Sequence, residues 1–192
     1  ASQSTNANQP QIYNGTAVLT ENGKPTLTFD TSDRATFTSD DIKSFFIVSA
    51  PTNINTGSIN AAVGLTTALR GIAVAGDSGS RQARAFTNSG TLNITGIGVS
   101  ADQSLVDYVT TGTNGKLRYN AANEVTGGAQ DITVDQIGGA SNFNMNGNIQ
   151  EVLMWDTNQD SNRAGIATDI NSNYLIYPPT DAPTSALLAT YT

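Results

Sequence analysis

The chain contains neither cysteine nor histidine. Without cysteine it can form no disulfide bond and offers zinc no thiolate ligand. Without histidine it has no Ser-His-Asp or Cys-His nucleophile and no imidazole that would respond to pH near neutrality. Any acid or base catalysis would therefore have to use carboxylates.

Long apolar runs and clusters of basic residues are also missing. No segment approaches the roughly eighteen consecutive apolar residues of a membrane-spanning helix. Lys and Arg number 9 against 16 Asp and Glu, which gives a net charge of -7 that repels phosphate backbones. We therefore expect neither a membrane nor a nucleic acid as a partner.

The sequence does contain short runs of β-branched and aromatic residues separated by turn signals, a pattern typical of an all-β sandwich. A chain of 192 residues fits one such domain. Asn-Gly pairs at 14–15, 22–23, 114–115 and 146–147 predict four turns. The predicted strands are 26–29, 44–50, 69–74, 83–86, 93–99, 105–110, 117–119, 132–137 and 149–155.

Two of these segments allow a finer prediction. The run Phe45-Phe46-Ile47-Val48 is apolar on both faces, which indicates a central strand that is covered on both sides. Residues 105–119 alternate in polarity around Asn114-Gly115, which predicts a half-buried hairpin.

One helix is expected near the end of the domain. Ile166, Ile170 and Tyr174 recur every four residues and form an apolar stripe that would pack on the sandwich, so we predict a helix over 161–174. Asp160 is the predicted N-terminal cap. Three of the six prolines follow in 178–192, which predicts a linker after a sandwich domain of residues 1–177.

Both ends of the domain resemble a known fold family. Residues 148–156 and the helix after them, ending in Asn173-Tyr174, resemble the closing strand and helix of concanavalin-like and laminin-G-like domains. Residues 9–12 and 22–30 look like the early strands of such domains in phage tail and fibre proteins. The resemblance implies an antiparallel two-sheet jelly roll with one C-terminal helix, and an opening strand that lies before residue 1.

The sequence Ile137-Gly138-Gly139 before Phe143 is similar to a stretch in the catalytic domain of α-L-arabinofuranosidase B, which has phage-encoded relatives. The resemblance implies that the acid carboxylate of the family stands directly after the Gly-Gly pair. In this chain that position is occupied by Ala140. The family nucleophile is a mid-chain Glu, whereas this chain has no Glu between Glu21 and Glu124. We therefore expect no catalytic residue and no enzyme activity.

Glycan binding in sandwiches commonly uses an aromatic ring beside amide groups. The candidate ligand-binding residues are Phe143, Asn142, Asn144 and Tyr119. Most rings in such a chain are core residues, and that reading stays open for each of them.

No cofactor and no metal site are predicted. Residues 156–160 begin like a calcium loop, but the sixth position is Ser161 where an EF-hand needs Gly. Calcium stays open as a ligand of Asp40-Asp41 or of the acidic turn 30–33.

The leading functional hypothesis is a non-catalytic structural and adhesive module of a virion, in a phage fibre, tail or capsid surface, that contacts host glycans. It would be virion-bound or extracellular, with copies of itself or other virion proteins as partners. The alternative is a glycosidase-like hydrolase of arabinose-containing polysaccharide, for which Glu151 is the best single carboxylate.

Overall fold

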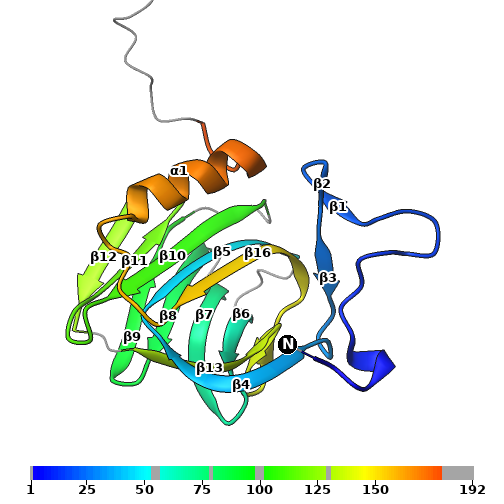
Figure 1. The fold of residues 1–192 in the computed structure, drawn as a ribbon, viewed down its shortest axis with the longest axis horizontal. Coiled ribbons are helices and arrows are strands. Elements are labelled where there is room, and N and C mark those ends of the chain that lie inside the picture. Colours follow the sequence, from blue (N-terminus) through cyan, green and yellow to red (C-terminus); the bar gives the residue numbers. More distant parts are fainter. Residues whose placement is uncertain (1, 53–56, 78–79, 98–101, 129–130, 179–192) are drawn as a thin grey trace, which may run out of the picture.

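The computed structural model describes residues 2–52, 57–77, 80–97, 102–128 and 131–178, which form two antiparallel sheets packed face to face with one helix outside (Figure 1). The first sheet has the order β12 (Asn123–Gly127), β11 (Gly115–Tyr119), β10 (Ser104–Thr110), β5 (Ser44–Pro51), β16 (Gly147–Trp155) and β3 (Leu27–Phe29). The second has the order β4 (Ala35–Ile42), β13 (Ile132–Ile137), β6 (Ile59–Leu65), β7 (Ala68–Asp77), β8 (Ser80–Thr87) and β9 (Gly90–Ile94). Smaller elements are η1 (Asn6–Asn8), the pair β1 (Thr20–Glu21) and β2 (Lys24–Pro25), the pair β14 (Gly139–Ala140) and β15 (Phe143–Asn144), and α1 (Arg163–Tyr174). The predicted all-β sandwich with one C-terminal helix is confirmed.

Strand β5 shows why the two layers and the helix hold together. Every residue of β5 is buried, as its apolar run predicted. Phe45 and Ile47 belong to the core between the sheets, whereas Phe46 and Val48 pack with residues of α1. Because removal of apolar surface from water is the main driving force of folding, this strand anchors both contacts.

Helix α1 lies across the outer face of the first sheet (Figure 1). Ile170 is 5% exposed and packs with Phe46, and Ile166 and Tyr174 are partly buried beside it, which confirms the predicted stripe. The predicted cap is wrong: the residue before the helix is Asn162, which makes no side-chain cap bond. The Asp160 carboxylate instead pairs with Lys116 Nζ at 2.5 Å, because strand β11 brings a cation within reach.

Burial of β10 corrects the prediction of a half-buried hairpin. All residues of β10 are buried, because α1 covers the face that would otherwise be solvated. Its partner β11 does alternate between buried and intermediate positions.

The four predicted turns differ in outcome. Asn22 and Gly23 have φ values of 49° and 71° and join β1 to β2 as a two-residue turn. Gly15 has a φ of 92° in a turn closed by a Tyr13 to Val18 bridge. The third turn precedes its predicted place, since Gly115 is already in β11 and Gly112 takes the positive φ. The fourth pair joins no hairpin, since Gly147 is the first residue of β16 and Asn146 precedes it.

Several strands escaped the sequence prediction, namely β1, β2, β4, β6, β12, β14 and β15. Strand β6 is rich in alanine, and β4 carries the exposed carboxylates of Asp40 and Asp41, so neither shows a clear β pattern. The predicted strand 93–99 is wrong in its bounds: β9 ends at Ile94, and Gly96 takes a φ of 70°. Residues 98 and 99 lie outside the described part.

The first part of the chain touches an edge strand of each sheet. Ser2 forms an antiparallel bridge with Thr36 of β4, and Gln11 forms one with Thr28 of β3. At the other end Pro178 is exposed, and the rest of the predicted linker, 179–192, lies outside the described residues. Among the described residues, no helix is long and apolar enough to cross a membrane.

Candidate functional site

The hairpin β14 to β15 lies on the outer face of the second sheet. Ala140 pairs with Phe143 across it, and Ser141 takes a positive φ of 53° in the two-residue turn. Ala140 is fully buried and packs with Ala61 of β6. A Cβ at Gly64 would come within 2.3 Å of the Ala140 Cβ, so only glycine lets the hairpin approach the sheet this closely.

Beside this hairpin is an open hollow of about 230 Å³, which we call the asparagine hollow. It is lined by Thr31, Gly57, Ser58, Ile59, Asn60, Asn142, Phe143, Asn144 and Asn146. The lining therefore combines one aromatic ring, one aliphatic side chain, two hydroxyls and four amides. Such a surface can stack on an apolar face and form hydrogen bonds at the same time.

Three of the four amides are positioned by hydrogen bonds from neighbouring loops. The Asn60 Oδ1 accepts the backbone N–H of Asn146 at 3.2 Å, and the Asn146 Oδ1 accepts the hydroxyl of Thr52 at 2.8 Å. The Asn144 Nδ2 donates to the carbonyl oxygen of Thr31 at 2.5 Å. Because these contacts fix the amide planes, the wall of the hollow is formed before any ligand arrives.

Unused hydrogen-bonding capacity lies at the same hairpin. Asn144 Oδ1 is buried and has no partner among the described residues, and the same holds for both amide atoms of Gln136, a fully buried residue of β13. A Cβ at Gly139 would lie 2.8 Å from Asn144 Oδ1 and 3.4 Å from Gln136 Nε2, so the two amides meet under this glycine. Buried polar atoms without partners cost free energy, and these atoms lie in the interior beneath the hairpin and not at the surface of the hollow.

The structure brings three of the four candidate residues together. Asn142, Phe143 and Asn144 all line the asparagine hollow, with Asn142 exposed and Phe143 half-buried. Tyr119 lies elsewhere: it is 8% exposed and belongs to the core between the sheets. Tyr119 is therefore a core residue and not a ligand-binding residue, because its position in β11 turns its side chain toward the interior.

Sequence reasoning missed the other side of the hollow. Asn60 and Ile59 belong to β6, a strand that was not predicted, and Asn146 was assigned only to a turn. The available signal was the density of asparagine in 142–148, which exceeds what one turn requires.

A second hollow, of about 300 Å³, lies between β16 and α1 and contains the best carboxylate candidate. It is lined by Glu151, Leu153, Trp155, Ile166, Asp169, Ile170 and Asn173. Burial raises the pKa of Glu151, and a hydrogen bond with Tyr174 opposes the rise. Trp155 packs edge-on against Phe46, with ring centroids 5.7 Å apart. The hollow thus holds two carboxylates beside an aromatic ring.

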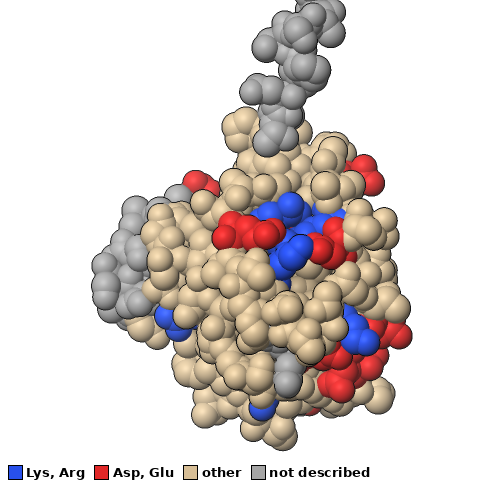
Figure 2. All heavy atoms as spheres, turned by 90° about the vertical axis from the view of Figure 1, so that its left-hand side faces the viewer, with Lys and Arg blue, Asp and Glu red and all other residues tan. Residues whose placement is uncertain are grey.

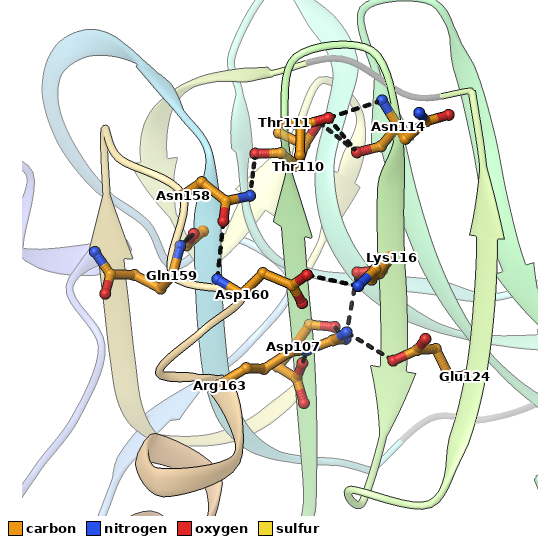
Figure 3. A network of polar contacts seen from close by, with 11 residues as sticks. Asp107, Thr110, Thr111, Asn114, Lys116, Glu124, Asn158, Gln159, Asp160 and Arg163 are labelled. Atoms are coloured by element: carbon orange, nitrogen blue, oxygen red, sulfur yellow. Dashed lines mark hydrogen bonds and ion pairs between the residues drawn. The ribbon is translucent and has the colours of Figure 1, made fainter.

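Charged side chains gather on another face, beside β11, β12 and the start of α1 (Figure 2). Asp107 of β10 is fully buried and pairs with Arg163 (Figure 3). It also pairs with Arg118 at 3.0 Å. Arg163 also reaches Glu124 at 2.8 Å. Burial raises the pKa of Asp107, and the two guanidinium groups oppose this rise. Because these charged side chains form ion pairs with one another, we assign them a structural role in joining α1 to the first sheet.

The acidic turns considered for calcium are occupied by local contacts. Asp30 Oδ1 accepts the backbone N–H of Ser32 at 2.7 Å, and Asp33 Oδ2 accepts the N–H of Asp30 at 2.8 Å. Asp41 accepts the hydroxyl of Thr133. Among the described residues, no group of three or more acidic side chains is placed to hold a metal ion.

Comparisons with known proteins agree with the fold. No protein-family model matches the chain, and no curated protein matches it. The SAP-like pentraxin of Limulus polyphemus is similar with a TM-score of 0.51 and 13% identity over 69% of this chain and 71% of its own. The enzymatically active domain of tailspike protein 2 from bacteriophage CBA120 has a TM-score of 0.50 and 11% identity over 82% of this chain and 28% of its own. The Ruminococcus gnavus IT-sialidase CBM40 has a TM-score of 0.49 and 15% identity over 66% of this chain and 83% of its own.

At these identities the likeness concerns the fold. The chain is an antiparallel jelly-roll sandwich of the concanavalin-like kind, as the two sheets and the covering helix already indicate.

Proposed function

We propose that this chain is a non-catalytic module that binds a glycan in the asparagine hollow. The observation that carries the proposal is the meeting of the Phe143 ring with four asparagine amides in one preformed hollow. A sugar ring offers an apolar C–H face that stacks on an aromatic ring, and hydroxyls that both donate and accept hydrogen bonds, as amides do.

We also propose that the module is a structural and adhesive part of a virion, bound to copies of itself or to other virion proteins. The support is the resemblance of residues 9–12 and 22–30 to phage tail and fibre domains. A host glycan in the hollow would give such a module an adhesive role.

The binding test starts with a glycan array, followed by calorimetry on the ligand with the strongest signal. Phe143→Ala is expected to weaken binding about tenfold or more, because an aromatic anchor carries a large share of such a contact. Tyr13→Ala is the matched control, since Tyr13 is an aromatic residue that is 54% exposed and does not line the hollow. If both variants lose affinity equally, or if neither loses affinity, the assignment of the site is contradicted.

A glycosidase-like hydrolase acting on arabinose-containing polysaccharide is the alternative, and the second hollow would be its site. Its support is the raised pKa of Glu151, which suits a general acid, and the presence of Asp169 in the same hollow. Against it stands the fully buried Ala140 at the position where the arabinofuranosidase resemblance has its acid.

An aryl arabinofuranoside separates the two functions. We expect the purified chain to release no aryl alcohol. Turnover that disappears in Glu151→Gln would favour the hydrolase and overturn the non-catalytic reading.

A further inference from the structure

The lining of the asparagine hollow has no charged side chain among the described residues. The segments that supply most of it are uncharged in sequence as well, from Pro51 to Leu69 and from Gln136 to Gln150. The hollow therefore offers a ligand only neutral hydrogen-bonding groups and apolar contacts.

The charges nearest to the lining in sequence do not favour an anion. Thr31 is flanked by Asp30 and Asp33, two carboxylates, and the cation that follows, Arg34, is not among the lining residues. The chain as a whole carries a net charge of -7. An acidic ligand would lose hydration in the hollow without gaining an ion pair in return.

The hydrogen bonds already made leave only neutral groups for a ligand. Asn60 Oδ1, Asn146 Oδ1 and Asn144 Nδ2 are used by the chain itself, and Asn144 Oδ1 is buried, whereas Asn142 is exposed at the hollow. A neutral amide can donate to and accept from the hydroxyls of a sugar, but it gives an anion no opposite charge.

We infer that the asparagine hollow selects uncharged sugars and discriminates against sialic acid, uronic acids and sulfated sugars. This inference rests on the proposed glycan-binding function and specifies the class of ligand.

The test is an array of neutral oligosaccharides, each printed beside a counterpart that differs only by a terminal sialic acid, a uronic acid or a sulfate. We expect the neutral member of each binding pair to give the stronger signal, by about tenfold. A stronger signal on the acidic members overturns the inference and leaves the proposed function intact. No signal on any member overturns the proposed function itself.

A second measurement uses the same array. The variant Asn142→Lys places a cation at the exposed rim and should shift preference at least about threefold toward acidic members. An unchanged preference would mean that the ligand lies outside the hollow.

Discussion

The two outer faces of the sandwich are covered in opposite ways. The outer face of the first sheet is covered by α1, whose apolar stripe packs on Phe46 and whose first residue, Arg163, pairs with the buried Asp107. The outer face of the second sheet carries the hairpin β14 to β15, which leaves an open hollow lined by amides. A buried ion pair thus joins the helix to the first sheet, whereas neutral amides line the open hollow on the second.

The largest effect is expected from Asp107→Ala. Arg163 has a side chain that is only 4% exposed, so the substitution leaves a buried cation without its main partner. The free energy of unfolding should fall by about 3 to 5 kcal/mol, measured by urea denaturation. Lys116→Ala, which breaks a half-exposed pair with Asp160, is the control and should cost less than about 1 kcal/mol. Equal losses would contradict the distinction between the buried and exposed pairs.

Ile170→Ala tests the apolar half of the same face. Ile170 is 5% exposed against Phe46, so the truncation should lower the free energy of unfolding by about 2 to 5 kcal/mol. Thermal denaturation of this variant beside Thr168→Ala, at an exposed helix position, provides the comparison. An unchanged melting temperature in Ile170→Ala would show that α1 does not depend on this contact.

A matched pair of glycine substitutions compares the two faces directly. Gly64→Ala places a Cβ within 2.3 Å of the Ala140 Cβ and should cost about 1 to 3 kcal/mol, as overpacking does. It should also reduce ligand binding, because the hairpin has to move. Gly165→Ala in α1 meets no atom within 4 Å and should stabilise the chain by about 0.5 to 1 kcal/mol. A Gly64→Ala variant that binds normally would separate the hairpin from the site.

The smallest expected effect concerns pH. Burial raises the pKa of Glu151, so the folded state favours the uncharged form of this carboxyl more than the unfolded state does. Its contribution to stability is therefore present below the usual pKa and decreases as pH rises through the folded value. Denaturation of wild type and Glu151→Gln between pH 4 and pH 7 should show wild type gaining stability relative to the variant as pH falls. The opposite trend would indicate a lowered pKa.

Local sequence was enough to predict the elements whose pattern is independent of their surroundings. Residues 132–137 are β13 to the residue, and their burial alternates as the side chains of a strand do. The run at Phe45 forms a central strand, because continuous apolar side chains must be buried wherever they go. The apolar stripe of α1 has the same property. Strand β6 could not be predicted, since alanine and asparagine gain a strand conformation only from their neighbours in the sheet.

Only the part of the site that is contiguous in sequence could be predicted. Asn142, Phe143 and Asn144 are adjacent in sequence, so one hairpin carries them together. Asn60 joins them only through the pairing of the second sheet, and Asp160 left its expected cap for Lys116, 44 residues away. Contacts of this range depend on the packed fold and leave no local signal.

The way the first residues attach to the sandwich has a mechanical consequence. Ser2 is joined to Thr36 by two backbone hydrogen bonds of 2.7 and 2.8 Å, and Gln11 is joined to Thr28 by two of 2.9 and 2.8 Å. A force applied at Ser2 meets the bridge to Thr36 first, then the hydrogen bond from the Arg34 N–H to the Asn8 carbonyl, and then the bridge to Thr28, so few bonds share the load at any moment. Pulling on Ser2 against Pro178 should therefore give a low-force extension of at most about 30 Å, the reach of the nine peptide units from Ser2 to Gln11, before the second bridge bears the load. The start of the chain would then act as a short extensible tether, and the sandwich behind it as the stiff element.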